Sequence, residues 1–415
     1  MKNSFLSVLI LILLAMGTDL RAQDVQWRGP NRDGIFPDTE LLKEWPVEGP
    51  DVLFVIRDLG KGFSSVVATE DMVYTTGLRD TMEYLIAMNL VGEKLWEKPI
   101  GRSWNQSFPE TRGTPTVEGE RLYILTGLDV MACFQRISGE LIWRVDLREA
   151  YGSRLDMFGV SESVLIVDDK VITTPCGDQT TVIALDKMSG ELIWKSGSMN
   201  AARGNMSPTL IEHCGFKYVI TSTQTHMIGV DPENGEILWD YHYNILSENK
   251  ENTTIMANTP VYKDSCLWIS NGWDVKSVML EIAPDGRSVS EKFTDQTFDN
   301  QNHGMVLVDD YLYGSNFTGR NSGKWVCMNW DTGEIVWIGD FHNKGPLIYA
   351  DGMLYLIEEK RGHIGLVEAT PKEFKLISEF RHSAGAGPYW SRPTIFNKVL
   401  YVRHGDALVA YKLSY

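Results

Sequence analysis

The chain has 415 residues, of which 43% are hydrophobic and 23% charged, a composition typical of a globular protein and unlike that of a disordered or collagen-like chain. Its 39 Lys and Arg against 55 Asp and Glu give a net charge of −16, which speaks against a binder of duplex nucleic acid or of anionic membranes. Thirteen Trp, 16 Tyr, 15 Phe and 37 Gly favour short strands joined by tight turns over a helical bundle.

The first 22 residues have the three-part pattern of a secretory signal peptide. Lys2 precedes an apolar run over residues 5–16, and a polar stretch then ends in Ala22. The alternative is an uncleaved N-terminal anchor, but the apolar run falls short of the about 18 residues that a membrane-spanning helix needs. We therefore expect a mature protein that begins near Gln23, lies in the periplasm or is secreted, and has no transmembrane span.

Five Cys residues are spread along the chain without a CxxC motif, a haem-attachment motif or an adjacent pair, at positions 133, 176, 214, 266 and 327. An odd count with no such pairing indicates that disulfides do not hold the fold together. We expect buried free thiols and no redox role.

An eleven-residue unit recurs along the chain. Its clearest copies are residues 184–194 (ALDKMSGELIW), 229–239 (GVDPENGEILW) and 327–337 (CMNWDTGEIVW). Weaker copies end at Trp96 and Trp143, and two degenerate copies end at Phe293 and Phe380. Each copy has an alternating strand, an Asp or Asn that caps a turn, a Gly for positive φ, and a second strand that ends in an aromatic residue, which predicts a β-hairpin.

A second strand pair precedes each hairpin by about twenty residues, as at residues 114–117 and 121–125. Four antiparallel strands in a repeat of 42 to 54 residues are typical of one blade of a β-propeller. After Phe380 the chain holds only three more strands, and residues 51–57 supply the missing fourth. Pairing the first strand with the last three removes the two open sheet edges.

The sequence therefore predicts an all-β fold: an eight-bladed β-propeller of four-stranded antiparallel blades over residues 51–415, closed by the N-terminal strand. Residues 23–50 form an N-terminal extension. The eight blades are marked by Phe54, Trp96, Trp143, Trp194, Trp239, Phe293, Trp337 and Phe380. One aromatic per blade at a fixed offset from a Gly turn indicates packing between blades rather than ligand stacking.

The unit at residues 184–194 fits the pattern A-x-D-x-x-[TS]-G-x-x-x-W. It resembles the tryptophan-docking motif of the PQQ-like (pyrroloquinoline quinone-like) β-propeller repeat family, which includes quinoprotein dehydrogenases and the outer-membrane assembly-factor propeller. Residues 26–34 (QWRGPNRDG) resemble the opening of secreted members of that family. The resemblance covers the whole mature chain. In the dehydrogenases it implies PQQ with Ca²⁺, a vicinal disulfide and a catalytic Asp, and no segment here matches those features, so the cofactor remains unassigned.

Residues just before the innermost strand of each blade converge on the propeller axis, and here they are polar. The ligand-binding candidates are Arg112, Arg203, Asn205, Asn258, Asn302, Lys344, Trp390 and Arg392. Glu162 and His303 are the candidates for proton transfer if the site is catalytic. Four cations against one carboxylate favour a carboxylate-bearing or polyhydroxylated ligand. The alternative is that these side chains pair with one another and with water in a wet channel.

Other candidate features are weaker. His213, His226 and His242 lack a metal-ligand spacing, and no metal site is predicted. Residues 101–109 and 383–389 are interblade loops that could also serve as lids.

The prediction for function is an exported propeller that binds a polar, anionic small molecule or carbohydrate in its axial funnel. Two alternatives stay open: a quinoprotein-like or other carbohydrate-active enzyme acting on alcohols or sugars, and an envelope protein-interaction scaffold. No nucleic-acid partner is expected.

Overall fold

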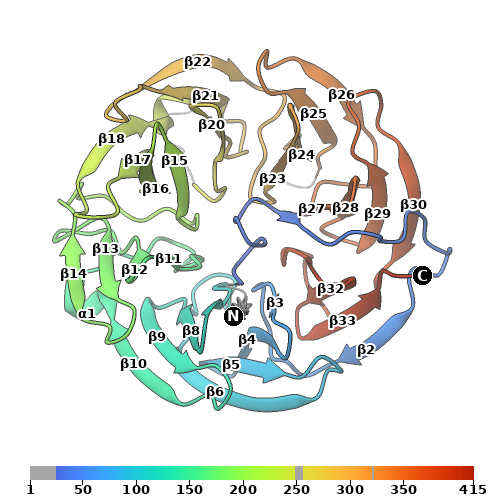
Figure 1. Ribbon diagram of the computed structural model, residues 1–415, viewed down its shortest axis with the longest axis horizontal. Helices are drawn as coiled ribbons and strands as arrows, with labels where there is room; N and C mark the ends of the chain where they lie inside the picture. The colour runs from blue at the N-terminus through green and yellow to red at the C-terminus, as the bar shows by residue number, and fades with distance from the viewer. Residues whose placement is uncertain (1–24, 248–255, 320–321) are drawn as a thin grey trace, which may run out of the picture.

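Eight antiparallel sheets surround a common axis in the computed structural model, which describes residues 25–247, 256–319 and 322–415 (Figure 1). The predicted eight-bladed β-propeller is confirmed. The predicted signal peptide, residues 1–22, lies outside the described residues. Over the described ranges the two helices are α1 (Leu147–Tyr151) and the 3₁₀ turn η1 (Tyr243–Leu246), and neither is long enough to cross a membrane.

The first seven blades each take four consecutive strands. The first four blades are β3 (Val67–Ala68), β4 (Val73–Arg79), β5 (Met82–Met88) and β6 (Lys94–Arg102); β7 (Thr116–Glu118), β8 (Arg121–Leu125), β9 (Val130–Gln135) and β10 (Leu141–Asp146); β11 (Leu165–Val167), β12 (Lys170–Thr173), β13 (Ile183–Asp186) and β14 (Leu192–Lys195); and β15 (Thr209–His213), β16 (Phe216–Ser222), β17 (His226–Val230) and β18 (Ile237–His242).

The remaining blades complete the ring. They are β19 (Val261–Lys263), β20 (Cys266–Ile269), β21 (Ser277–Ile282) and β22 (Val289–Asp295); β23 (Met305–Val308), β24 (Tyr311–Ser315), β25 (Trp325–Asn329) and β26 (Ile335–Gly339); β27 (Leu347–Ala350), β28 (Met353–Ile357), β29 (His363–Glu368) and β30 (Leu376–Arg381); and β31 (Thr394–Phe396), β32 (Val399–His404) and β33 (Ala407–Lys412) with β2 (Val52–Ile56). The short β1 (Ile35–Phe36) adds to the seventh blade beside β27.

The eighth blade joins the last three strands of the chain to β2, a strand from its N-terminal part. Strand β2 pairs antiparallel with β33, with Phe54 opposite Ala410 and Ile56 opposite Leu408. Gly49, just before β2, lies so close to Phe380 of the seventh blade that an added Cβ would be 2.6 Å from the ring. Gly49 therefore takes the place of a turn glycine in a blade whose third and fourth strands are far apart in sequence.

In six of the eight blades the aromatic of the outer strand packs on a turn glycine of the next blade, whereas Trp239 does not meet Gly286 and Trp337 packs on Phe374 instead. An added Cβ at Gly190 would lie 2.8 Å from Trp143, and one at Gly235 would lie 2.4 Å from Trp194. The indole of Trp194 also donates a hydrogen bond to the carbonyl of Pro232 at 2.9 Å. The interpretation of these aromatics as blade-to-blade packing is confirmed.

The apolar core lies between neighbouring blades. One cluster joins Tyr74 and Leu85 of the first blade to Leu122 and Phe134 of the second, and all four side chains are buried. Burying one such side chain contributes about 1.5–3 kcal/mol, so each blade is stabilised mainly by its two neighbours.

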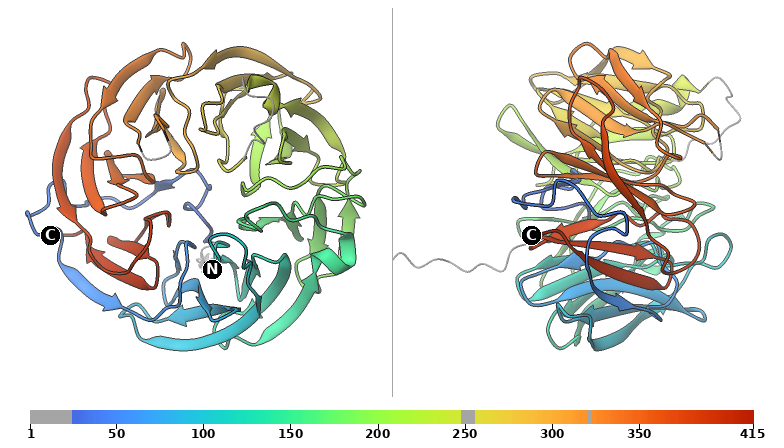
Figure 2. Two further views of the ribbon diagram at one scale, coloured as in Figure 1. Left: turned by 180° about the vertical axis from the view of Figure 1, so that it is seen from behind. Right: turned by 90° about the vertical axis from the view of Figure 1, so that its right-hand side faces the viewer.

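The N-terminal extension crosses the middle of the ring. Figure 1 shows the dark blue segment running from the centre toward β27, and Figure 2 shows it from behind and from the side. Its residue Val25 bridges Val117 near the axis, and Ile35 pairs in parallel with Tyr349. The extension therefore lies across the axis before it reaches the outside of the ring at β2.

The contact between glycine and tryptophan can be tested by comparing two glycines with similar backbones. Gly190 has φ +76° and lies against Trp143, whereas Gly352 has φ +79° and has no atom within 4 Å of an added Cβ. Both Gly→Ala changes place an L-residue in the left-handed region, which costs about 1–2 kcal/mol. Gly190→Ala should cost about 1–3 kcal/mol more, because the new methyl meets the indole. Urea unfolding of both variants measures the difference, and equal losses would contradict the docking role.

Candidate functional site

Two arginines of the N-terminal extension fill part of the axis. The Arg32 guanidinium donates to the carbonyls of Ser163 at 2.9 Å and Pro208 at 2.8 Å, and also to the carbonyl of Val164. Arg28 donates to the carbonyl of Met305 in the sixth blade. Both side chains are buried, and burial lowers the pKa of Arg32 to about 9 and that of Arg28 to about 10. The extension thus joins the third, fourth and sixth blades from inside the ring.

Arg203 lies in a closed ion cluster rather than facing an open channel. Its guanidinium contacts Asp129 and Glu162 at 2.7 Å each, and all three side chains are at most 1% exposed. Glu162 also accepts a hydrogen bond from the backbone N–H of Thr174 at 3.2 Å. Although burial lowers it, the attraction of Asp129 and Glu162 raises the pKa of Arg203 above its ordinary value, and burial raises the pKa of Glu162. The cluster joins three consecutive blades.

His303 belongs to a second group, centred on Glu359 of the β28–β29 loop. The carboxylate oxygen Oε2 of Glu359 lies 3.2 Å from Nε2 of His303 and accepts a hydrogen bond from the indole of Trp390 at 3.2 Å. Lys344 lies 4.0 Å from the other oxygen, and its ammonium sits over the Phe317 ring at 4.4 Å. Burial lowers the pKa of His303, while His303 and Lys344 outweigh burial and hold the pKa of Glu359 below its ordinary value.

Trp390 also belongs to a cluster of aromatic rings. Its ring centroid lies 5.0 Å from that of Phe63 and 5.1 Å from that of Phe108. Phe108 comes from the 101–109 loop, and its carbonyl accepts a hydrogen bond from Arg112, as do those of Ser107 and Phe158. Arg112 therefore holds this loop in place next to Trp390.

Arg392 and Asn302 adjoin each other on the axis above Trp27. Arg392 donates to the Asn302 carbonyl, and its guanidinium lies 4.8 Å from the Trp27 ring centroid. Burial, with a smaller effect of Arg28, lowers the pKa of Arg392 to about 9. Nε of Arg392 and Oδ1 of Asn302 are buried without a hydrogen-bond partner. Such groups are normally satisfied by protein, water or ligand.

Positive charge at the axis is incompletely balanced. Within the described ranges, no carboxylate lies within 4 Å of the guanidinium groups of Arg28, Arg32 or Arg392, whereas Arg203 contacts two. At longer range Asp33 attracts Arg28 and Glu162 attracts Arg32. Buried charges are usually paired, so the excess at the axis is suited to an anion.

The predicted residues fall into separate groups. His303, Lys344 and Trp390 meet at Glu359, and Asn302 meets Arg392. Asn258 is buried in the wall, where its amide donates to the Asn300 carbonyl at 2.7 Å, and Asn205 donates to Asp156. Glu162 and Arg203 contact each other and Asp129.

The sequence reasoning missed Glu359, Asp129 and the three extension residues Trp27, Arg28 and Arg32. The segment QWRGPNRDG was recognised only as a resemblance, although two arginines beside a tryptophan were a visible signal of an anion or carbonyl contact.

The axial residues do not fit PQQ with Ca²⁺. The five cysteines are free; four are buried as expected, but Cys214 is exposed, so the expectation was wrong for that residue. Burial raises the pKa of the Cys176 thiol near Arg203 to about 12. The axial carboxylates of Asp129 and Glu162 are bound by Arg203, and that of Glu359 is bound by His303 and Trp390. Among the described axial residues none of these carboxylates is free to coordinate a metal ion.

Residues 81–337 match the model of a family described as outer membrane protein assembly factor BamB. Among solved structures, BamB from Moraxella catarrhalis is 17% identical with a TM-score of 0.63, covering 87% of this chain and 97% of its own. The quinohemoprotein alcohol dehydrogenase from Comamonas testosteroni is 9% identical with a TM-score of 0.66, covering 92% of this chain and 79% of its own. A europium-containing methanol dehydrogenase is 12% identical with a TM-score of 0.64, covering 93% and 89%. These structures share the fold, and no curated protein matches the chain.

The Arg203 cluster predicts that removing the guanidinium strongly lowers the stability of the protein. Arg203→Met should lower the free energy of unfolding by about 3–5 kcal/mol, because two buried carboxylates lose their partner. The loss should be smaller at pH 5 than at pH 8, since unpaired buried carboxyls take up protons more readily. Urea unfolding at both pH values measures this. The control Arg287→Met removes an exposed ion pair with Glu236 and should leave stability unchanged; a similar loss in both variants would contradict the assignment.

Glu83 predicts a dependence of stability on pH. Its carboxylate accepts a hydrogen bond from the N–H of Gly127 at 2.8 Å, and burial raises its pKa from 4.5 to about 7. The pKa of Glu83 is higher in the folded than in the unfolded protein. Its contribution to the free energy of unfolding is therefore fully present below pH 4.5 and is lost as the pH rises through about 7. The loss amounts to up to about 3 kcal/mol.

Glu83→Gln should flatten this change, since the amide still accepts from Gly127 and does not titrate. Urea unfolding between pH 4.5 and pH 8 tests it, with the exposed Glu140→Gln as the control. If the free energy of unfolding of Glu83→Gln changes with pH as steeply as that of the wild-type protein, other groups cause the pH dependence.

Proposed function

The chain belongs to the family described as outer membrane protein assembly factor BamB, and on that premise we propose that it binds a polar, anionic small molecule at the axial end of its propeller. The site comprises Arg392, Asn302 and Trp390. The indole of Trp390 donates a hydrogen bond to Glu359, and His303 and Lys344 lie next to that carboxylate. The observation that carries the proposal is the positive charge of Arg28, Arg32 and Arg392, which have no carboxylate within 4 Å in the described part of a protein whose net charge is −16.

The unpartnered atoms indicate which groups the ligand carries. Nε of Arg392 needs an acceptor, which a carboxylate supplies, and Oδ1 of Asn302 needs a donor, which a hydroxyl supplies. The rings of Trp390, Phe63 and Phe108 offer apolar faces of the kind on which a sugar ring packs. A sugar acid such as a uronate carries all three features, so this class of ligand is favoured over a neutral sugar.

The cellular location is part of the proposal. The signal-peptide pattern of residues 1–22 and the family description both support export to the cell envelope or beyond. We therefore take the ligand to be extracytoplasmic. Quinone-dependent oxidation of alcohols or sugars is not proposed, because the axial carboxylates are already engaged by Arg203 and His303.

Titration calorimetry and thermal unfolding of the mature protein test the binding proposal. We expect D-glucuronate or D-galacturonate to raise the unfolding midpoint, since a ligand bound only by the native state stabilises it. Arg392→Gln should weaken binding at least about tenfold, the effect of losing one charge-assisted hydrogen bond of about 1.5–3 kcal/mol. Asn302→Asp, which places a negative charge beside Arg392, should weaken binding of the acid in the same way.

Two comparisons make the test specific. Arg287→Gln removes an exposed arginine elsewhere and should bind as wild type. D-glucose lacks the carboxylate and should bind much more weakly than D-glucuronate. Equal binding of the two sugars, or full affinity in Arg392→Gln, would contradict the proposal.

A protein-interaction scaffold is the second candidate, supported by exposed apolar residues on an outer strand. Val52, Leu53 and Val55 of β2 are 53%, 49% and 47% exposed, and Leu95 of the neighbouring blade is 53% exposed. Exposed apolar groups that lie together mark contact surfaces more often than single ones do. If every sugar and sugar acid fails to bind, and Leu53→Lys abolishes a complex that the wild-type protein forms in envelope extracts, this candidate replaces the first.

A further inference from the structure

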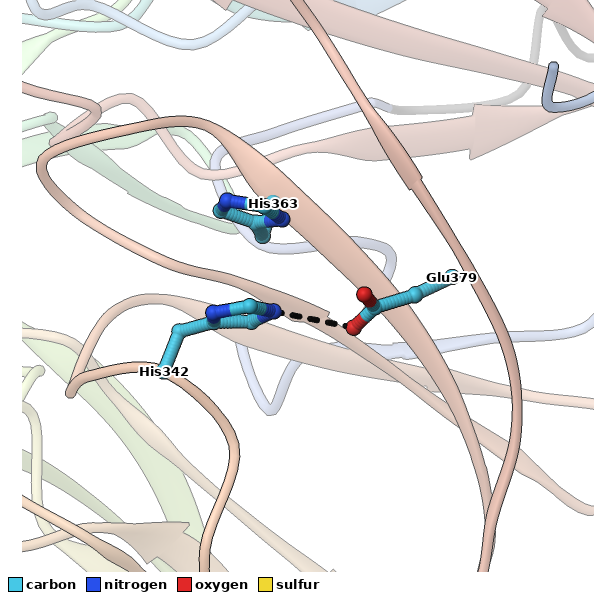
Figure 3. A group of neighbouring side chains, drawn as sticks. All are labelled: His342, His363 and Glu379. Carbon is cyan, nitrogen blue, oxygen red and sulfur yellow. Dashed lines mark hydrogen bonds and ion pairs between the residues drawn. The ribbon is translucent and has the colours of Figure 1, made fainter. Parts of the chain in front are cut away.

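Three side chains of metal-ligand type meet on the seventh blade, away from the axial contacts described above. His342 lies in the loop before β27, His363 is the first residue of β29, and Glu379 lies on β30 (Figure 3). One ligand atom from each lies within 4.8 Å of the other two. Over residues 25–247, 256–319 and 322–415, this is the one group of three His, Cys, Asp or Glu side chains so arranged.

The strand register explains why His363 and Glu379 meet. In the antiparallel pair, His363 is opposite Arg381, and Gly365 is opposite Glu379. His363 and Glu379 are therefore diagonal neighbours on one face of the sheet, a separation that long side chains can bridge. Gly365 leaves space there, and the Phe341 ring fills it at 2.8 Å from the position of an added Cβ. Phe341 thereby holds His342 beside the pair.

The two imidazoles stack with ring centroids 3.6 Å apart and planes 17° from parallel. Nε2 of His342 lies 3.0 Å from Oε2 of Glu379. Each ring also presents a nitrogen on the side that faces the carboxylate, as Figure 3 shows. A tetrahedral zinc ion with bonds of about 2.0–2.1 Å needs its ligand atoms about 3.3 Å apart. The spacing of His342 and Glu379 is close to that value, and a turn of the His363 ring completes three ligands.

Charge and access also suit a cation. The side chains of His342 and Glu379 are 32% and 40% exposed, so an ion can reach them from solvent. The nearby cation Arg381 is opposite His363 in the strand pair, and its Nε donates to the carbonyl of Arg361 at 3.2 Å.

We propose that His342, His363 and Glu379 bind a divalent transition-metal ion of the zinc type, with the fourth position open to water or a small anion. Two imidazoles and one carboxylate are suited to zinc and related ions, whereas calcium and magnesium prefer oxygen ligands alone. The site is independent of the proposed axial ligand. It is close to that region in sequence, because His342 precedes Lys344 and His363 follows Glu359 by only a few residues.

Titration calorimetry of the chelator-treated mature protein with ZnCl₂ tests the proposal. The visible absorption spectrum after addition of CoCl₂ reports the coordination of the bound ion independently. We expect one Zn²⁺ per chain and a Co²⁺ visible spectrum typical of nitrogen and oxygen ligands. His342→Ala, His363→Ala and Glu379→Gln should each weaken binding at least about tenfold, because even the hydrogen-bond partners of metal ligands have effects of that size. Circular dichroism shows whether each variant keeps the wild-type fold.

The chain offers a matched control. His226 and His242 also stack, at 4.4 Å and 8°, with Asp240 3.8 Å from His226, but they are not joined by a third ligand at the required spacing. His226→Ala should therefore bind zinc as wild type. Absence of stoichiometric binding, or loss of binding in His226→Ala with retention in His342→Ala and His363→Ala, would overturn the proposal.

Discussion

Most blades of this ring are held by an aromatic side chain that packs on a glycine of the neighbouring blade. The contact needs a residue that has no side chain and whose backbone has a positive φ. Gly139, Gly190 and Gly235 meet both requirements at successive turns. Because the aromatic and the glycine belong to different blades, neither blade can be positioned alone. This contact sets the angle between sheets, and through it the distance of each innermost strand from the axis. The convergence of polar side chains at the axis is therefore a result of packing near the outer edge of the ring.

Two solutions to buried charge coexist inside the ring. Around Arg203, one cation contacts two carboxylates from neighbouring blades, and the cluster is closed to solvent. Around Arg28, Arg32 and Arg392, the guanidinium groups instead use backbone carbonyls and an indole ring. Carbonyls satisfy the N–H donors but do not neutralise the charge. The first arrangement places positive and negative charges in direct contact, whereas the second leaves a positive charge that the anion of the proposed function would offset.

The fold could be predicted from the sequence because its determinants are local and repeated. The turn Asp or Asn, the Gly and the aromatic lie within eleven residues, and their recurrence fixed both the number of blades and the closing role of β2. The same repeat predicts that His303, Lys344, Trp390 and Arg392 lie near the axis. Their shared partner Glu359 could not be predicted, since it comes from the loop between β28 and β29 and not from a position just before an innermost strand.

The same limit applies to the histidine pair. His342, His363 and Glu379 are separated by 21 and 16 residues, spacings that match no metal motif, and they meet only through the strand register and the position of Phe341. The extension arginines act across the ring, on carbonyls more than a hundred residues away. The partners in contacts of this kind depend on the assembled ring and cannot be identified from a local pattern.

The split eighth blade ties the order of synthesis to the order of folding. Phe54 pairs with Ala410, so one of the earliest strands to leave the ribosome finds its partner only when nearly the whole chain has been made. Until then Gly49 has no Phe380 to contact, and both ends of the incomplete ring expose strand edges. Pairings this distant in sequence are slow to form, because the loop between them must close first. A nascent chain of this protein therefore stays open until translation is almost complete, and an open chain is the form that the export proposed above would require.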